Sequence, residues 1–443
     1  TFNLNRTIAD HLITIPGVSL NGQGGQFQSY SIRGFSRGRI RTEVDGIPII
    51  TDRRAGNSVS FIAPELFSLG QVIKGPSSAV YGSQAMGGVV SLSTQMQDES
   101  SVKLEGQLNN EAVNLVVKHI NNGLSGGLAY QKSQKETAPN GSELNTEFER
   151  ASGVLRYQHQ GDELTTTISW LPSYGQDIGK SNTKYDVKEV SQYPEEIHSL
   201  AQVQLDAKSG WSAKVFHHYQ NWDSTTLRFE QYDALTEYQS HTLGGQWLAS
   251  IDNKLFEGTG LENLDFDSHI GFDYLARKGV KINSRYELFS SETNQDLNLI
   301  TNDLLTNEMT GSEDNLAVYN KNSWNWGKAI LGFALRYDWI KQQGLDEKDE
   351  YDSQLNGSFS VRYPLTDSLN MELDLANGFR YPTLSERFFN GRTPRGFITG
   401  NKDLKAETSV GGQLVVNWQG HESWSLHGAV YKYELENYIE RYR

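Results

Sequence analysis

The sequence has no cysteine, few prolines and no excess of basic residues. The absence of cysteine excludes disulfide frameworks and thiolate metal sites, without fixing the compartment. A formal net charge of −14 argues against a general nucleic-acid-binding protein, because neutralising phosphates requires a basic surface. We therefore expect no nucleic-acid partner.

Long apolar stretches are also missing. No run approaches the roughly 18 residues that a membrane-spanning helix requires. No basic and apolar leader opens the chain, although a leader could have been removed together with whatever preceded Thr1. A closed β-barrel stays compatible with the sequence, because such a barrel spans the bilayer without apolar helices.

The pattern of the sequence changes near residue 97. Before it, one helical candidate, "NRTIADHLITIPG", is followed by short β runs and glycine turns, which predicts a compact α/β domain. After it, about fifteen long segments alternate between apolar and polar residues, and period two indicates β-strands. In 368–375, for example, Leu373 and Leu375 share one face while Glu372 and Asp374 share the other. The fold class is therefore expected to be mostly β.

The predicted strands favour a membrane barrel over a soluble sheet. They run to about 9 to 13 residues, where the usual strand has about 5 or 6 and a tilted membrane strand needs about 9 to 11. Many apolar faces end in an aromatic residue, as at Trp170, Trp339 and Trp418, which suits the aromatic girdles of an outer-membrane barrel. Long connections, expected at 276–314 and 379–407, alternate with tight ones. A soluble sandwich or propeller with one solvated face is the alternative.

One glycine-rich stretch, "QVIKGPSSAVYGSQAMGGVVSLSTQ" (71–95), raises the question of a phosphate-binding loop. A Walker loop requires Lys and then Ser or Thr after the second glycine, but Gly88 and Val89 follow Gly87. A dinucleotide fingerprint opens a helix, whereas "GGVVSLST" is predicted to be a strand. Both nucleotide-binding interpretations therefore fail.

The same stretch resembles the plug-domain signature of TonB-dependent outer-membrane transporters. The segments "ADHLITIPGVSLNGQGG", "YSIRGF" and "TEVDGIPI" resemble the same domain in order and spacing, and "NGFRYPTLSERFF" and "GNKDLKAETSVGGQLVVNW" resemble the late barrel. The resemblance implies a transmembrane antiparallel β-barrel around an N-terminal α/β plug, with domains at 1–97 and 98–443. The family's barrel has about 22 strands, and about 15 to 16 are expected here. The family's TonB-binding box and its last strands have no counterpart, so we expect a fragment.

Function follows from the resemblance as an expectation. It implies active uptake across the outer membrane of a Gram-negative bacterium, driven by TonB with its inner-membrane energising complex, in contact with outer-membrane lipid and lipopolysaccharide. A non-transporting β-rich surface binding protein is the alternative from another class. An enzyme is not expected, since no G-x-S-x-G opens a helix. No His/Asp/Glu cluster has metal-ligand spacing, so we expect no intrinsic metal or cofactor.

The signature turn is expected to be structural. A Gly-Pro pair makes a rigid turn, later glycines allow close backbone packing, and one large side chain is expected to anchor against the barrel wall. In the order of the chain these residues are Gly75, Pro76, Tyr81, Gly82, Gly87 and Gly88. Where Gln71 stands, the family usually has an acidic residue.

Ligand-binding residues are expected at one end of the barrel, again by resemblance. The two plug turns 21–28 and 47–60 contribute Gln26, Phe27, Arg53, Arg54 and Asn57, and the long loop 387–402 contributes Arg387, Phe388, Phe389, Arg392, Arg395 and Phe397. Arginines interleaved with aromatic rings suit an anionic, partly aromatic ligand, most simply a ferric siderophore. The alternative ligands are cobalamin, haem or another metal chelate. In a further interpretation, the arginines contact lipopolysaccharide phosphates instead of a ligand. Haem receptors of the family carry a histidine between the "FRYP"-like and "GNKDL"-like motifs, and residues 380–404 contain none.

Ionic contacts between plug and barrel are expected at four residues. Arg33 and Lys74 are charged residues in a buried-looking context, and buried charges should be paired. Glu372 and Asp374, on a barrel face that points inward, are the candidate partners.

Overall fold

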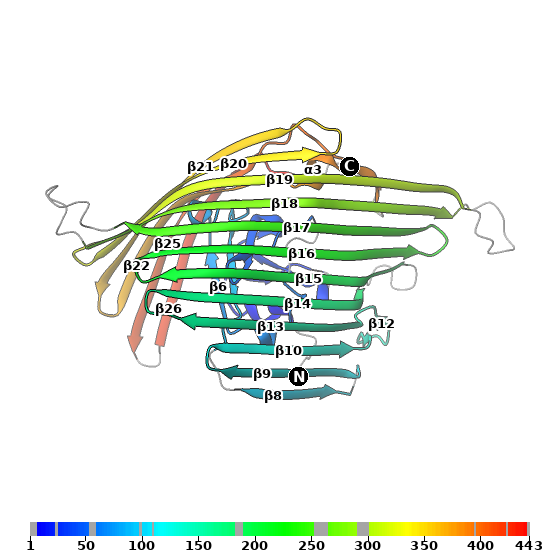
Figure 1. Cartoon of the computed structure of the whole chain (residues 1–443), viewed down its shortest axis with the longest axis horizontal. Coiled ribbons are helices and arrows are strands. Elements are labelled where there is room, and N and C mark those ends of the chain that lie inside the picture. Colours follow the sequence, from blue (N-terminus) through cyan, green and yellow to red (C-terminus); the bar gives the residue numbers. More distant parts are fainter. Residues whose placement is uncertain are drawn as a thin grey trace.

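The computed structural model describes residues 7–22, 25–52, 59–96, 100–108, 110–181, 189–251, 265–289, 301–393, 396–421 and 424–440. One large curved sheet dominates the molecule, and a small domain formed by residues 7–96 lies on its inner side (Figure 1). We call the small domain the plug and the large sheet the wall. In the described part of the chain, no helix is both long enough and apolar enough to cross a membrane.

The plug contains short helices and two small sheets. Strands β1, β2 and β3 form one sheet, and the other has the order β5-β4-β7-β6, in which only β4 and β7 are parallel. Helix α1 begins after Thr7, whose backbone NH donates to the Asp10 carboxylate at 2.7 Å. The elements are α1 (Ile8–Leu12), β1 (Val18–Leu20), η1 (Gly25–Phe27), β2 (Tyr30–Ile32), β3 (Phe35–Ser36), η2 (Arg37–Arg39), β4 (Ile40–Val44), β5 (Ile47–Pro48), η3 (Pro64–Leu66), β6 (Leu69–Lys74), α2 (Ser78–Tyr81) and β7 (Gly88–Ser93).

The wall is an antiparallel sheet that has 15 strands among the described residues, with β8 and β26 at its edges. Each wall strand pairs with the next wall strand along the chain, in some cases across a short turn and in others across a longer connection such as 381–406. The strands are β8 (Ser101–Gln107), β9 (Ala112–Asn121), β10 (Leu124–Ser133), β13 (Phe148–Gln160), β14 (Leu164–Lys180), β15 (Glu189–Ala207), β16 (Trp211–Arg228), β17 (Tyr232–Ile251), β18 (Asp265–Phe289), β19 (Thr301–Trp326), β20 (Ala329–Gly344), β21 (Glu350–Thr366), β22 (Leu369–Arg380), β25 (Glu407–His421) and β26 (Trp424–Glu436).

One predicted loop is wrong. The stretch 276–314 was expected to be a long connection, but β18 and β19 run through most of it and only 290–300 lies outside the described residues. A register shift lies between Arg277 and Val280 of β18. Before this bulge the apolar side chains point outward, as at Phe272. After it the apolar side chains point inward and are buried, as at Ile282. The bulge adds one residue and moves the even-numbered side chains from the outer to the inner face, while the apolar residues stay at even positions, as at Val280.

The two faces of the wall have opposite polarity. On β16, outward Val215 is 61% exposed, while the inward neighbours His218 and Gln220 are buried. The same pattern recurs along the sheet, with exposed apolar or aromatic side chains at Leu128, Leu155, Trp170, Leu243, Phe272, Val318, Phe359, Leu373 and Trp418. An outward apolar band over a polar interior suits a sheet that faces hydrocarbon.

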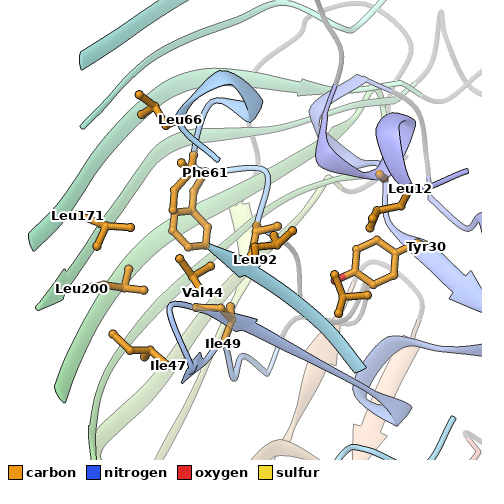
Figure 2. Packing of buried hydrophobic residues seen from close by; sticks show 14 of the residues in the cluster. Leu12, Tyr30, Val44, Ile47, Ile49, Phe61, Leu66, Leu92, Leu171 and Leu200 are labelled. Carbon is orange, nitrogen blue, oxygen red and sulfur yellow. The ribbon is translucent and has the colours of Figure 1, made fainter. Parts of the chain in front are cut away.

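The core joins the plug to one side of the wall. Phe61, Val44 and Ile47 of the plug pack in one cluster with Leu171 of β14 and Leu200 of β15 (Figure 2). Further wall residues of this cluster come from β9, β10, β13 and β16, namely Val116, Ala129, Val154 and Phe216. The apolar core is therefore shared between plug and wall.

Truncation in this shared core is expected to weaken the plug modestly. Replacing Ile47, which is fully buried, with valine should lower the plug's free energy of unfolding by about 0.5–1.5 kcal/mol. Urea denaturation followed by a probe in the plug measures this. Ile330→Val, which truncates an outward, exposed side chain of the wall, is the control. Equal urea midpoints of plug unfolding for the two variants would contradict a core that is shared between plug and wall.

Candidate ligand-binding site at the mouth of the wall

Connections along the wall alternate between two ends. Turns 122–123, 161–163 and 208–210 lie at one end, and the connection 381–406 lies at the other, on the right of Figure 1 beside α3 (Leu384–Phe388). Plug residues reach this second end, since Arg150 at the start of β13 donates to the Gln26 side chain at 2.6 Å. We call this end the mouth.

An aromatic stack lines the inner side of the mouth. Phe27 of the plug meets Tyr193 edge-on at 4.5 Å between ring centroids. Tyr193 stacks on Trp222 at 5.3 Å, and Trp222 stacks on Tyr238 at 4.8 Å. The stack thus crosses β15, β16 and β17, whose inward positions are brought level by the sheet register. Such rings offer a large apolar surface with a polar edge.

The connection between β22 and β25 folds down onto this stack. Within it, α3 begins with a capping box in which the backbone NH of Thr383 donates to Glu386 at 2.8 Å and the backbone NH of Glu386 donates to the Thr383 hydroxyl at 3.2 Å. Phe388 and Phe389 are each 7% exposed and pack in the same cluster as Trp222. These two phenylalanines, predicted to contact ligand, hold the loop against the wall in this structure.

The arginines of this connection have different surroundings. The guanidinium of Arg387 is buried and donates to the carbonyl of Leu404 at 2.7 Å, so it closes the loop on itself. Arg392, on β23 (Asn390–Thr393), lies over the ring of Tyr286 at 5.2 Å. Phe397, on β24 (Gly396–Thr399), is 70% exposed. Predicted residues Arg53, Arg54, Asn57 and Arg395 lie outside the described residues.

Sequence reasoning missed the residues that complete a basic and aromatic cluster around Arg392. Tyr286 stacks on Tyr232 at 4.8 Å, and Arg228 interacts electrostatically with both tyrosines. We call Arg228, Tyr232, Tyr286 and Arg392 the mouth cluster. Its first three members lie at the mouth ends of β16, β17 and β18, and only the strand register shows that they meet.

Asp52 ties the second plug turn to both β18 and α3. Its buried carboxylate accepts hydrogen bonds from Arg277, from the Tyr238 hydroxyl at 3.3 Å and from the backbone NH of Ser385 at 3.3 Å. Burial opposes ionisation of this carboxyl, but the charge and hydrogen bond of Arg277 and the hydrogen bond of Ser385 outweigh it and hold the pKa below its ordinary value. Asp52 is therefore ionised at neutral pH.

A second ionic contact between plug and wall centres on Glu407. Its side chain is fully buried and accepts from Arg39 of the plug at 2.6 Å and from Arg380 of β22 at 2.6 Å. Arg380 also pairs with Glu386 of α3 at 2.8 Å. The chain of charges connects the plug, the wall and the mouth connection, and pairing makes the buried charges tolerable.

The four residues predicted to make ionic contacts have other direct partners. Arg33 donates to the Tyr433 hydroxyl and lies 4.2 Å from the ring centroid of Tyr431, while Lys74 donates to a plug carbonyl, that of Pro16, at 3.4 Å. Glu372 pairs with Arg362 at 3.3 Å. Asp374 accepts from Gln413 at 2.6 Å, and Arg33 acts on it only through the electrostatic field.

The signature turn binds the wall through backbone groups. The Gln84 NH donates to the Phe379 carbonyl at 2.9 Å, and the Phe379 NH donates to the Ser78 hydroxyl at 3.0 Å. A Cβ at Gly87 would lie 2.2 Å from the Phe35 side chain, and one at Gly88 would lie 2.4 Å from the Ile73 carbonyl oxygen. Because the Phe35 side chain fills the space at Gly87 and the β6 backbone fills it at Gly88, both positions require glycine.

The remaining signature residues also lie in or beside this contact. Gly75 faces the Tyr433 hydroxyl and Gly82 faces the Arg336 guanidinium, each 3.0 Å from where a Cβ would stand. Pro76 follows Gly75 between β6 and α2. Tyr81, the predicted wall anchor, is partly buried and interacts with Glu43 and Arg41 of the plug's own β4.

No cluster of three or more His, Cys, Asp or Glu side chains in the described part of the chain has a geometry that could hold a metal ion. The described residues of the mouth offer charge and aromatic surface to a ligand.

Comparisons with known proteins agree with this architecture. Residues 129–443 match the family described as "TonB dependent receptor-like, beta-barrel", and residues 3–89 match the "TonB-dependent Receptor Plug Domain". The Vitamin B12 transporter BtuB of Vibrio vulnificus (strain CMCP6) is 24% identical over 427 residues, covering 92% of this chain and 61% of the relative. The Ferrienterobactin receptor of Escherichia coli (strain K12) is 21% identical over 98% of this chain and 66% of its own length.

Solved structures show the same fold. The Copper transporter OprC superposes with a TM-score of 0.74 at 16% identity, covering 96% of this chain and 67% of that one. The hemophore receptor HasR of Serratia marcescens superposes with a TM-score of 0.73 at 15% identity, covering 98% of this chain and 72% of that one. These matches confirm the predicted mostly-β fold of a plug and a barrel, although this chain spans about three fifths of the length of the Vibrio relative. The chain belongs to the TonB-dependent receptor family.

Proposed function

We propose that the whole protein takes up a ferric siderophore across the outer membrane of a Gram-negative bacterium, energised by TonB and its inner-membrane complex. The observation that carries this proposal is the mouth cluster, in which Arg228 and Arg392 surround two stacked tyrosines, Tyr232 and Tyr286. The two cations, of which Arg228 lies opposite Glu189 in the strand pair, and the aromatic faces together suit an anionic chelate with aromatic groups, held by charge-assisted hydrogen bonds and by stacking.

Other predicted residues extend the same proposal. Exposed Phe397, which pairs with Arg392 in the β23–β24 hairpin, would add aromatic surface. Arg53, Arg54, Asn57 and Arg395 stay proposed ligand-binding residues. Gln26, Phe27, Arg387, Phe388 and Phe389 would act less directly, because in this structure they hold the plug apex and the mouth connection in place. Outside the wall, the apolar outward face would contact outer-membrane lipid, with lipopolysaccharide around the mouth.

Cobalamin is the second candidate cargo. The Vibrio relative, a vitamin B12 transporter, matches 92% of this chain. Haem is favoured less, because residues 380–404 contain no histidine, although the Hemin receptor of Yersinia enterocolitica is 38% identical over 22% of this chain. A surface protein that binds its ligand without transporting it is the candidate from another class.

Uptake by cells that express the whole protein tests the proposal. Radiolabelled iron would be supplied as a catecholate chelate, as a carboxylate chelate or as haem, and labelled cobalamin would be supplied in parallel. We expect accumulation of one siderophore type, abolished by a protonophore and by deletion of TonB. Uptake of cobalamin alone would transfer the proposal to that cargo. Binding without energy-dependent accumulation would contradict transport.

Removal of one cation from the mouth cluster is expected to weaken ligand capture. Arg392→Ala should raise the dissociation constant of an anionic ferric chelate about tenfold, since a desolvated cation–π or charge-assisted contact contributes about 1–2 kcal/mol. Quenching of intrinsic fluorescence measures the affinity. Arg362→Ala is the control, because Arg362 makes an exposed pair on β21 toward the other end of the wall. Equal affinities for both variants would remove Arg392 from the site.

A further inference from the structure

The outer face of the wall has an open groove between β18 and β21. These four strands lie side by side in the sheet (Figure 1). The volume of the groove is about 560 Å³, and its lining includes Tyr274, Leu316, Trp339 and Lys341. We call it the outer groove. It lies on the side of the wall away from the plug, so it is separate from the mouth cluster and from the contacts between plug and wall.

The strand register places the apolar part of the lining in one row. Tyr274 of β18 stands opposite Leu316 of β19, and Leu316 stands opposite Trp339 of β20. All three side chains are between 39% and 43% exposed. Because side chains two residues apart share a face of a strand, this row continues the apolar band that includes Phe272 and Val318.

A charged row lies one step nearer the mouth. Asp314 stands opposite Lys341, and Lys341 stands opposite Tyr351. Lys278, beside the bulge in β18, donates to the Asp314 carboxylate at 2.6 Å. Lys341 pairs with Asp349 at 2.7 Å and lies 5.9 Å from the ring centroid of Tyr351. Two ammonium groups and two carboxylates therefore border the apolar row on its mouth side.

The outer groove lies where the apolar band ends. Toward the turns, exposed apolar side chains continue on the same face, as at Val318 and Leu355. Toward the mouth, the exposed positions of β18 are polar, as at Lys281 and Asn283. Aromatic side chains at such a border are typical of the boundary between hydrocarbon and water in an outer-membrane sheet. The position therefore favours an amphipathic occupant over a water-soluble one.

The charged row indicates which kind of lipid fits. An ammonium group has three donors, so partly exposed Lys278 and Lys341 can donate to a phosphate as well as to their carboxylates. Asp314 and Asp349 can accept from hydroxyl groups. Tyr351 is 69% exposed and offers the flat apolar face of its ring to a sugar. A phosphate, sugar hydroxyls and a sugar face occur together in a phosphorylated glycolipid.

We propose that the outer groove is a binding site for one phosphorylated, acylated glycolipid, lipid A, in the outer leaflet. Its phosphate lies at Lys278 and Lys341, and an acyl chain follows Leu316 and Trp339 toward the turns. The site deepens the proposed function, on whose outer-membrane location it rests, because it turns a general lipid contact into a defined one. It requires neither a cargo nor a movement of the plug.

Binding of lipid A to the purified whole protein in detergent tests this site without any transport. In a titration followed by native mass spectrometry, Lys341→Ala should raise the dissociation constant about tenfold, the effect of one charge-assisted hydrogen bond. Lys132→Ala is the matched control, because Lys132 of β10 also pairs with an acid, Glu149 at 2.9 Å, that accepts from a tyrosine hydroxyl. Its effect should stay below about twofold. Equal effects of the two variants would overturn the proposal, and Lys278→Ala replaces Lys341→Ala if the latter misfolds.

Two further lipids test the chemistry of the occupant. Dephosphorylated lipid A lacks the group that the lysines bind, and phosphatidylglycerol has a phosphate without a sugar. Both should bind the parent protein about tenfold more weakly than lipid A. Phosphatidylglycerol bound as tightly as lipid A would overturn the assignment to a glycolipid. Absence of uptake by cells would count against the proposed function instead, since binding to the purified protein does not depend on uptake.

Discussion

Replacing Glu407 with alanine is expected to loosen the plug from the wall by about 3–5 kcal/mol, the cost of breaking a buried ion pair from one side. The fully buried carboxylate accepts from Arg39 and from Arg380, each at 2.6 Å, and also from the Ile439 backbone NH at 2.6 Å. Its removal leaves the Arg39 guanidinium buried with no acid beside it among the described residues. Arg380 retains Glu386, so most of the effect should appear at the plug.

The urea concentration at which the plug unfolds inside an intact wall measures this loss. Glu434→Ala is a matched control on the neighbouring strand, since Glu434 pairs with Lys432 at 2.7 Å but both side chains are exposed. Exposed pairs contribute little, and no measurable change is expected there. Glu407→Gln should lie between the two, because it retains hydrogen bonds without the charge. A Glu407→Ala midpoint equal to that of Glu434→Ala would show that the plug does not depend on this network.

The wall was predictable because its physical rule is local. Alternation places Leu373 outward and Asp374 inward by period two alone, and the structure agrees at both positions. The assignment of faces changes at the bulge between Arg277 and Val280, where a single extra residue exchanges the inward and outward positions. Gly279, with φ +56°, lies in that bulge, but a glycine after two basic residues suits a loop equally well, so the continuation of β18 was not predicted.

Contacts between plug and wall were predictable in kind but not in detail. The sequence indicated that buried plug arginines need partners, yet Arg39 rather than Arg33 meets a wall carboxylate. Which arginine does so depends on how far the plug reaches into the wall and how it is rotated. Those quantities are set by many apolar contacts at once, such as Phe61 against His198 at 3.8 Å between ring centroids, and no spacing in the sequence encodes them.

The mouth connection carried a signal that the sequence analysis did not use. "TLSE" at 383–386 has the form of a capping box, which predicts a helix where only a charged and aromatic loop was expected. A helix there has an apolar face formed by Leu384 and Phe388, and both are buried in the structure. The mouth cluster gave no comparable signal, because Arg228 and Tyr286 come from strands that only the register aligns.

Acidification is expected to release the second plug turn from the mouth, and Asp52 is the group responsible. A carboxyl whose pKa in the folded protein is lowered contributes stability that is fully present above its ordinary pKa of about 3.9. That contribution is lost as the pH falls below about 3.9 and through the lowered pKa that Asp52 has in the folded protein. At neutral pH, Asp52→Asn should remove the same contribution, about 3 kcal/mol for a broken buried pair, because Glu313, 3.7 Å from Arg277, can compensate only in part.

Hydrogen exchange at the Ser385 amide reports on this contact directly, since that NH donates to Asp52. We expect Asp52→Asn to accelerate its exchange at least tenfold at neutral pH and to flatten the dependence of its protection on pH below about 4. Asp349→Asn is the control, because Asp349 makes an exposed pair with Lys341 at 2.7 Å, and it should leave both measurements unchanged. If the variant and the parent lost protection over the same pH range, another group would hold the plug turn, and the mouth connection would be anchored independently of Asp52.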